Sequence, residues 1–209
     1  MQGSGIEIGA GSDPFPIPSG VGIKYVDCIT PADLIKIYPE YSRIRFVNVD
    51  FLAQADELPF TTASQNFVIN AHLLEHLVNP LKAVKEWHRV LTKGGILYSI
   101  IPDKVFTYDK ERPCTTLEHV VHDYHRPSVR KDIEHLKEYF QLVEKIKDQD
   151  AIKKRVRETI KNKDPMIHYH VWDYKGIKDF FHYVSTWLGM DIKLMTSDKN
   201  FEAIIVLQK

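Results

Sequence analysis

Close to its start, the chain carries an apolar segment that runs into two glycines separated by one residue. Residues 6–12 read Ile-Glu-Ile-Gly-Ala-Gly-Ser, so that Glu7 stands between two isoleucines and is followed by Gly9 and Gly11. Glycine adopts backbone angles that other residues avoid, and it lets a ligand lie against bare peptide. The pattern is typical of a buried parallel strand whose next turn admits a ligand, with a plain tight turn as the alternative.

Strand-like and helix-like segments alternate after this loop, which predicts an α/β fold with a largely parallel sheet. A proline-rich run at residues 13–20 follows the loop and excludes a helix there. The expected strands are residues 4–8, 23–26, 45–49, 66–70, 96–101, 191–195 and 203–207. Capping residues and amphipathic spacing predict helices at residues 31–38, 72–77, 80–91, 129–161 and 176–187.

The composition is that of one ordinary globular domain of 209 residues. Lys plus Arg and Asp plus Glu both number 28, and this balance argues against nucleic acid or an anionic membrane as a partner. The sequence shows no apolar run long enough to cross a bilayer and no signal-peptide pattern. Cys28 and Cys114 fit free thiols in a reducing compartment. We therefore expect a cytoplasmic protein without a membrane partner.

Carboxylates stand at the ends of the first three expected strands, and ligands of an open parallel sheet bind outside the carboxyl ends of its strands. Asp27 ends the second strand, some ~20 residues beyond the glycine loop, where a carboxylate can hydrogen-bond the hydroxyls of a bound ribose. Asp50 ends the third strand at the position of an adenine pocket, with Gln54 and Asp56 as rivals. Glu7 either contacts the ligand or accepts hydrogen bonds from amides of the glycine loop.

A series of features in order along the chain resembles the class I S-adenosylmethionine-dependent methyltransferases. The features are Glu7-Ile-Gly9-Ala-Gly11, Tyr25-Val-Asp27, Asp50, Leu58-Pro59-Phe60, residues 67–77, Arg89-Val-Leu-x-x-Gly94-Gly95 and a closing strand hairpin. A narrower resemblance is to methyltransferase-domain proteins of polysaccharide and surface-glycan biosynthesis. It is carried by Pro102-Asp103-Lys104, Thr107-x-Asp109-x-x-Arg112-Pro113, Glu118-His119 and Asp123-Tyr124.

The resemblance implies a Rossmann-like sheet of seven strands with an antiparallel last strand, helices on both faces and a helical insertion after the fifth strand. It implies a single domain over residues 1–209, with a cofactor-binding half at 1–103, an acceptor-site insertion at 104–173 and a closing helix and hairpin at 174–209. S-adenosylmethionine would be the cofactor and S-adenosylhomocysteine the product. The cofactor contacts expected from this are Glu7, Gly9, Ala10, Gly11, Asp27, Asp50, Asn70, Ala71 and His72.

The sequence departs from the family pattern in two places. Asp13 replaces the third glycine of the loop and prolines replace the helix that follows, which removes the helix N-terminus that binds pyrophosphate in dinucleotide folds and argues against NAD. Little sequence precedes the first strand, where the family often has a helix that covers the methionine end. A binding or scaffold protein that keeps the fold without catalysis is therefore the alternative.

Histidines gather in three places after the fourth and fifth strands. Residues 72–76 match the zinc-peptidase pattern H-x-x-E-H through His72, Glu75 and His76. A methyltransferase explains these residues without a metal, because His72 would begin the loop that faces the methyl group, and Pro80 ends the helix too early for a peptidase. We expect no metal and keep zinc hydrolysis as a further alternative. The groups at residues 118–125 and 168–172 are expected to line one pocket with His72.

The expected reaction is methylation of a hydroxyl on a small-molecule or glycan-related acceptor, with N-methylation or a carboxylate acceptor also open. The protein must hold the acceptor in line with the methyl group and take up a proton from the hydroxyl. The ordered candidates for this base are His119, Asp103, His72 and Asp123. The candidates for acceptor binding are Lys104, Tyr108, Arg112, His122 and His170. For the two cations, surface ion pairs with Asp109 or Glu111 are the alternative.

The sequence is compatible with a monomer or a homodimer. Aromatic residues in the last expected helix, Phe180, Phe181 and Trp187, fit either a hydrophobic core or a dimer contact. Their near-helical spacing with other apolar residues favours the core.

Overall fold

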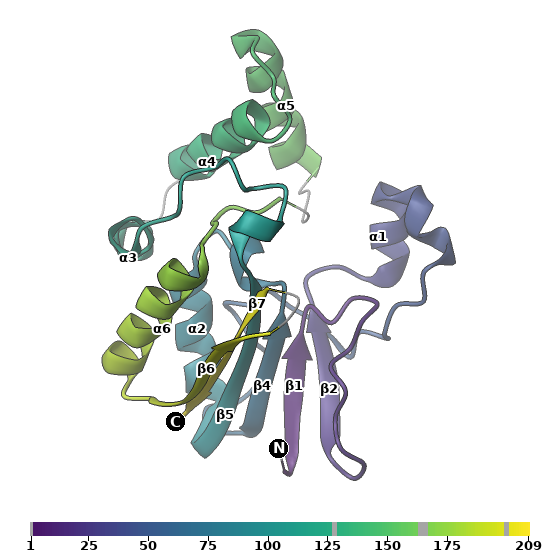
Figure 1. Cartoon of the computed structure of the whole chain (residues 1–209). Coiled ribbons are helices and arrows are strands. Elements are labelled where there is room, and N and C mark those ends of the chain that lie inside the picture. Colours follow the sequence, from purple (N-terminus) through teal and green to yellow (C-terminus); the bar gives the residue numbers. More distant parts are fainter. Residues whose placement is uncertain (1, 127–128, 163–166, 199–200) are drawn as a thin grey trace.

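The computed structural model describes residues 2–126, 129–162, 167–198 and 201–209. These residues contain one seven-stranded sheet in the order β3-β2-β1-β4-β5-β7-β6 (Figure 1). The strands are β1 (Ser4–Ile8), β2 (Gly22–Asp27), β3 (Phe51–Leu52), β4 (Gln65–Ala71), β5 (Leu91–Pro102), β6 (Asp191–Ser197) and β7 (Glu202–Gln208). Strand β7 runs antiparallel to β5 and β6, and the other neighbours pair in parallel. The predicted Rossmann-like sheet with an antiparallel last strand is confirmed.

The helices begin and end at the residue types that helix capping requires. The α-helices are α1 (Pro31–Ile37), α2 (Pro80–Val90), α3 (Leu117–His125), α4 (Val129–Leu142), α5 (Gln149–Asn162) and α6 (Tyr174–Leu188), with short 3₁₀ turns at η1 (Pro39–Arg43), η2 (Leu74–His76) and η3 (Lys104–Phe106). The side chains of Thr30, Asn79 and Asp173 accept hydrogen bonds from the first turns of α1, α2 and α6. Gly189 ends α6 in the left-handed conformation that glycine favours.

The main core lies between the sheet and helices α2 and α6. Trp87 of α2 and Phe181 of α6 are fully buried in it, against alternate residues of β5 and β7 such as Leu97 and Ile205. The aromatic residues of α6 were predicted to be core residues, and the burial of Phe180 and Phe181 confirms this. Helix α3 joins the same layer through Val120.

The opposite face of β5 is covered differently from the expectation of helices on both faces. Successive side chains of a strand point to opposite faces, so that Tyr98 lies on the face away from Leu97 and helix α6. Phe15 packs against Tyr98 there, with ring centroids 4.7 Å apart. Phe15 belongs to the proline-rich run at residues 13–20, which cannot form the helix that would otherwise follow β1.

The third strand differs from the prediction. Residues 45–49 were expected to form it, but the strand is the two-residue segment Phe51–Leu52, with Phe51 opposite Val26. The amide of Val47 donates instead to the carbonyl of Gly11 at 3.0 Å, and the amide of Asp50 donates to the carbonyl of Tyr25 at 2.9 Å. The segment before β3 is thus held by the glycine loop and joins β2 only near its end.

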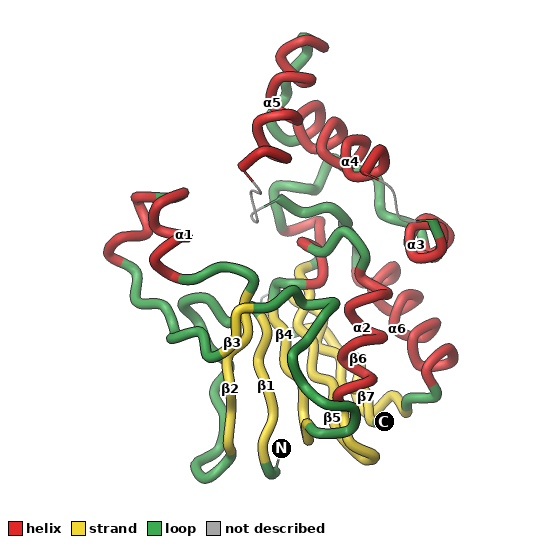
Figure 2. The backbone as a smooth tube through the Cα atoms, turned by 180° about the vertical axis from the view of Figure 1, so that it is seen from behind, coloured by secondary structure: helices red, strands yellow, loops and turns green. Residues whose placement is uncertain are grey.

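Two groups of helices rise from the carboxyl ends of the strands (Figures 1 and 2). Helices α3, α4 and α5 form the predicted insertion after β5, and the single charged helix expected at 129–161 is divided into α4 and α5. The insertion has its own small apolar cluster, which includes Leu136, Phe140 and Ile152. Helix α1 stands apart on the other side and buries none of its residues. None of the described helices is both long and apolar enough to cross a membrane.

Candidate functional site

A cleft with a volume of about 2030 Å³ opens at the carboxyl ends of β1, β2 and β4. This is the edge at which open parallel sheets bind their ligands. Residues that were predicted to contact the cofactor line it from three strands: Glu7, Gly9, Ala10, Gly11, Asp27, Ala71 and His72. The structure thus brings these residues together along one cleft.

The glycine loop has the geometry that its sequence predicts. Gly9 has φ +73° and Gly11 has φ +56°, the left-handed region in which other residues are strained. A Cβ atom added to Gly9 would lie 3.2 Å from Cδ1 of Leu73, which leaves little room for any side chain. The amide of Gly9 donates to the carbonyl of Val26 at 2.9 Å, so that the loop crosses directly over the end of β2. The cleft is lined here by bare peptide.

Glu7 and Asp27 both contribute carboxylates to this cleft, in different ways. The Glu7 carboxylate accepts hydrogen bonds from the amide of Phe15 at 3.0 and 3.2 Å, which favours the structural interpretation of this residue. Burial raises the pKa of Glu7, and the Phe15 amide opposes the shift. Asp27 accepts from the amide of Ile29 at 3.2 Å and lines the cleft at the end of β2. Burial also raises the pKa of Asp27, against hydrogen bonds from backbone amides.

Two of the predicted cofactor contacts lie outside the cleft. The Asp50 carboxylate accepts a hydrogen bond from the amide of Tyr25 at 2.8 Å, because the strand it was assigned to begins one residue later. Gln54 and Asp56, the alternative candidates for the adenine contact, do line the cleft. Asn70 is fully buried, and its side-chain amide donates to the Ser99 hydroxyl at 2.8 Å. The segment after β3, and not Asp50, therefore lines this part of the cleft.

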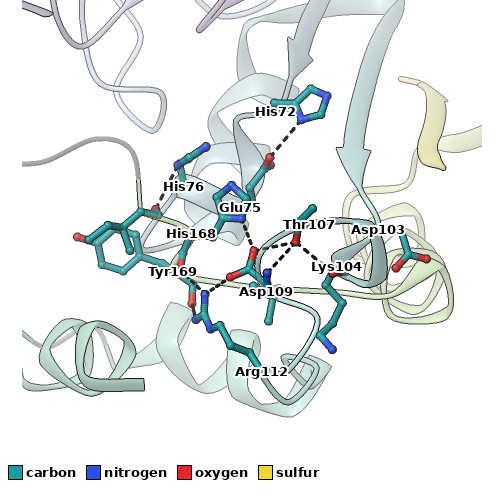
Figure 3. Close-up of polar contacts among 12 residues, drawn as sticks. His72, Glu75, His76, Asp103, Lys104, Thr107, Asp109, Arg112, His168 and Tyr169 are labelled. Atoms are coloured by element: carbon teal, nitrogen blue, oxygen red, sulfur yellow. Dashed lines mark hydrogen bonds and ion pairs between the residues drawn. The ribbon is translucent and has the colours of Figure 1, made fainter. Parts of the chain in front are cut away.

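His72 is the histidine that follows β4, and it lines the cleft. Its backbone has φ +49°, a conformation that is uncommon outside glycine and that is often found at functional sites. The imidazole Nε2 lies 2.7 Å from a carboxylate oxygen of Glu202 on β7. On the other side of the ring, Nδ1 lies 3.8 Å from Oε1 of Glu75, a contact that Figure 3 shows. Of the four predicted bases, His72 is the one that the structure places in the cleft.

Beneath His72 lies a buried group that sequence reasoning assigned only to helix-face hydrogen bonding. Glu75 is 2% exposed and neither of its carboxylate oxygens has a hydrogen-bond partner among the described residues. Burial raises the pKa of Glu75 to about 8. Its neighbours are His76, which bonds the carbonyl of Ile167 through Nδ1 at 3.1 Å, and His168. The H-x-x-E-H spacing was the one signal for this group in the sequence.

The positions of His72, Glu75 and His76 do not fit the zinc-peptidase alternative. The pattern needs two histidines on one face of an α-helix, but residues 74–76 form a 3₁₀ turn of three residues. His72 points to Glu202, while His76 groups with Glu75 and His168 instead. His168 in turn bonds Asp109 through Nδ1 at 2.6 Å (Figure 3).

The residues predicted to bind the acceptor lie outside the cleft. Arg112 is 2% exposed and forms an ion pair with Asp109 at 2.8 Å. The alternative of a surface ion pair with Asp109 therefore named the right partner, but the pair is buried. Lys104 donates to the carbonyl of Lys110 at 2.9 Å. Tyr108 is half-exposed and stacks on His168 with centroids 4.7 Å apart. These side chains hold the segment after β5 in place.

The remaining predicted bases and acceptor contacts are also placed elsewhere. Both carboxylate oxygens of Asp103 accept from backbone amides, those of Val105 and Tyr174, at 2.9 and 3.0 Å. His119, His122 and Asp123 lie on α3, and His170 is fully buried behind it. The predicted pocket is present only in part: His125 and Tyr169 line the cleft together with His72, whereas His119, His122 and His170 lie outside it.

Sequence reasoning missed the apolar wall of the cleft opposite the sheet. This wall comes from α1, η1 and the segment after them: Leu34, Ile37, Tyr41, Ile44 and Phe46. The weak signal for it was a helix with apolar residues that no neighbouring element covers. Ile37 and Ile44 remain exposed at 39% and 40%.

Known proteins are similar to part of this chain. Residues 23–99 match the family profile described as a methyltransferase domain. An uncharacterised protein of Methanocaldococcus jannaschii is 32% identical over 101 residues, which are 48% of this chain and 45% of the relative. A probable S-adenosylmethionine-dependent methyltransferase of Mycobacterium tuberculosis is 29% identical over 100 residues, 45% of this chain and 36% of the relative. The chain thus spans less than half the length of these curated relatives.

Solved structures show the same fold over nearly the whole chain. A protein from Pyrococcus horikoshii has a TM-score of 0.54 at 17% identity, covering 100% of this chain and 82% of that one. An S-adenosylmethionine-dependent methyltransferase from Methanosarcina mazei has a TM-score of 0.51 at 16% identity, covering 99% and 92%. In its sheet order, its glycine loop and the profile matched over residues 23–99, the chain is similar to the S-adenosylmethionine-dependent methyltransferases.

Proposed function

We propose that this protein transfers a methyl group from S-adenosylmethionine to a hydroxyl of a small-molecule or sugar-related acceptor, leaving S-adenosylhomocysteine. The observation that carries the proposal is the convergence of Gly9, Asp27 and His72 on one cleft at the carboxyl ends of three neighbouring strands. The first two residues suit an adenosine, and the third suits proton removal.

The cleft residues fit the cofactor that the family implies. The left-handed glycines offer a surface on which Cβ atoms would intrude, and the Asp27 carboxylate is an acceptor for ribose hydroxyls. Gln54 and Asp56 supply polar atoms beyond the ribose. When bound, the sulfonium cofactor supplies a methyl group that is already activated. The cleft volume of 2030 Å³ exceeds the roughly 300–1,000 Å³ of ordinary small-molecule sites, so that an acceptor also has room.

His72 is the base in this proposal. Glu202 accepts the hydrogen of Nε2 at 2.7 Å, which leaves the lone pair of Nδ1 to receive the acceptor's proton. The same carboxylate stabilises the imidazolium that results, as a carboxylate does in a catalytic triad. The role of the left-handed backbone at His72 is to turn the ring toward the cleft.

The walls of the cleft support a flat or ring-shaped acceptor. Tyr41 and Phe46 lie on the α1 side with ring centroids 6.3 Å apart, and Tyr169 lies on the side of the insertion. Aromatic faces of this kind are common walls of small-molecule sites. A screen of methyl transfer against nucleotide sugars, surface-glycan precursors and hydroxylated aromatic compounds tests the acceptor class, with S-adenosylhomocysteine formation as the measured product.

Cofactor binding should depend on Asp27 and not on Asp50. We expect Asp27→Asn to weaken S-adenosylmethionine binding by about 10- to 100-fold, the effect of losing a hydrogen bond to a charged acceptor worth about 1.5–3 kcal/mol. Isothermal titration calorimetry with S-adenosylmethionine and S-adenosylhomocysteine measures it. Asp50→Asn is the matched control, since its carboxylate is bound by the Tyr25 amide outside the cleft. Equal weakening by both variants would contradict the assignment, and no heat from the wild type would favour a non-catalytic scaffold.

A further inference from the structure

Four metal-ligating side chains converge between helices α3 and α4, away from the cleft. Helix α3 contributes His119 and Asp123, which share one face at a spacing of four residues. Helix α4 contributes His135, and the segment before α6 contributes His170. One ring nitrogen from each of the three histidines lies within 4.8 Å of those of the other two. We propose that His119, His135 and His170 form a zinc site, with the Asp123 carboxylate beside it.

Two of the imidazoles lie at a distance close to that between ligands of one zinc ion. Nε2 of His119 lies 3.0 Å from Oδ2 of Asp123 and 3.1 Å from Nε2 of His135. Nε2 of His135 lies 3.6 Å from the same oxygen of Asp123. Zinc bonds to nitrogen and oxygen of about 2.0–2.2 Å place tetrahedral ligand atoms about 3.3–3.6 Å apart. The two imidazole nitrogens are therefore close enough to share one ion, and the Asp123 carboxylate lies beside them.

His170 provides the second, independent observation. It is fully buried, and its Nε2 lies 3.2 Å from the carbonyl of Val78. A carbonyl only accepts, so that Nε2 carries the hydrogen and Nδ1 keeps its lone pair. That Nδ1 has no hydrogen-bond partner among the described residues. A buried acceptor without a partner costs about 1–3 kcal/mol, and a metal bond at Nδ1 would remove this cost.

The hydrogen bond on the far side of the His170 ring also fits a metal site. Metal-bound histidines usually donate their other ring N–H to a carbonyl or a carboxylate, which fixes the tautomer. The bond from His170 to Val78 is a contact of this kind. A hydrogen bond between His119 and His135 with Asp123 beside them would explain three of the four side chains without a metal. It leaves Nδ1 of His170 unexplained, whereas a zinc ion bound by the three histidines would give that nitrogen a partner.

A metal here would tie the insertion to the rest of the domain. The amides of Tyr169 and His170 both donate to the carbonyl of Glu75 in η2, while the other ligands lie on α3 and α4. The half-exposed ring of His119 gives the ion a route from solvent. None of these side chains is among the described residues that line the cleft, so that the zinc site is separate from the proposed site of methyl transfer. Three imidazoles are a donor set that zinc accepts readily.

The test uses the full chain without a polyhistidine tag, freed of metal by a chelator and titrated with zinc or cobalt. We expect one zinc per chain, a rise of Tm on zinc addition, and the intense visible absorption of tetrahedral cobalt. His119→Ala is the informative variant, because a half-exposed side chain is removed without opening the core. It should weaken zinc binding at least about tenfold, the lower end of the effect of losing even an outer-shell partner, and abolish the Tm shift.

Two control variants test whether the loss of zinc binding is specific to the proposed ligands. His122→Ala removes an exposed histidine from the same helix and should leave zinc affinity unchanged. His76→Ala removes a donor from the separate group with Glu75 and His168. Wild-type zinc affinity in His119→Ala, or zinc loss in His76→Ala alone, would overturn the assignment. So would a wild type that binds cobalt only in the pale octahedral form.

Discussion

We expect Arg112→Met to lower the free energy of unfolding by about 3–5 kcal/mol, because removing one partner of a buried ion pair leaves the other charge uncompensated. Arg112 is 2% exposed, and its Nη1 lies 2.8 Å from Oδ1 of Asp109 and 2.8 Å from the carbonyl of His168. Its Nε lies 2.9 Å from Glu138 of helix α4. One guanidinium thus joins the segment after β5 to the insertion and to the segment before α6. Methionine keeps the apolar stem and removes only the charge and the donors.

The state of Asp109 explains why the effect should be large. Burial alone would raise the pKa of Asp109, but the hydrogen bonds from His168 and Arg112 outweigh it and lower the pKa. The carboxylate is therefore charged in the folded protein at neutral pH and depends on its partners. Urea unfolding of Arg112→Met measures the loss as a shift of the midpoint at an unchanged slope.

Two further variants separate the loss of this pair from a general effect of removing a cation. Lys145→Met removes an exposed ion pair with Glu111 and should cost no more than about 1 kcal/mol. Asp109→Leu combined with Arg112→Met removes both charges, and it should be less destabilising than the sum of the two single variants. A cost below about 1 kcal/mol for Arg112→Met alone is incompatible with its bridging role.

The parts of the fold that depend on local sequence were predictable. The glycine loop, the capped helices and the alternating strands each depend on a few neighbouring residues. The position of Asp27 at the end of the second strand follows from its distance to the glycine loop. The third strand was misplaced because the amide of Val47 pairs with Gly11, more than thirty residues earlier in the chain. A strand of only two residues carries too short an apolar pattern to be recognised against such a contact.

The candidate site was predictable only where it lies on the sheet. His72 directly follows β4, so that its position is fixed by the strand. His119 and Asp123 were ranked among the bases, but they lie on α3, whose direction is set by the burial of Val120 against the core. Sequence spacing places these residues on one helical face and does not tell which way that face points. The burial of Arg112 and of Glu75 likewise depends on contacts far apart in the chain.

We expect His72→Asn to lower the rate of methyl transfer by about 10²- to 10⁴-fold, the usual contribution of a general base. Asparagine tolerates the left-handed backbone that His72 adopts at φ +49°, so that the change removes the base without straining the loop. S-adenosylmethionine affinity should stay within a few-fold of the wild type, because Gly9 and Asp27 are the residues proposed to hold the cofactor. The measurement is formation of S-adenosylhomocysteine with the acceptor found in the screen, beside calorimetry of cofactor binding.

Matched variants decide whether His72 itself moves the proton. Added imidazole should restore part of the activity of His72→Ala, where space for the ring is left, and should not affect the wild type. Glu202→Gln keeps a hydrogen-bond acceptor at 2.7 Å from Nε2 but removes the charge, so that its loss should be smaller than that of His72→Asn. His122→Ala, on exposed helix α3, should transfer methyl groups at the wild-type rate. Full turnover by His72→Asn would assign the proton to another group in the cleft and leave His72 as a wall residue.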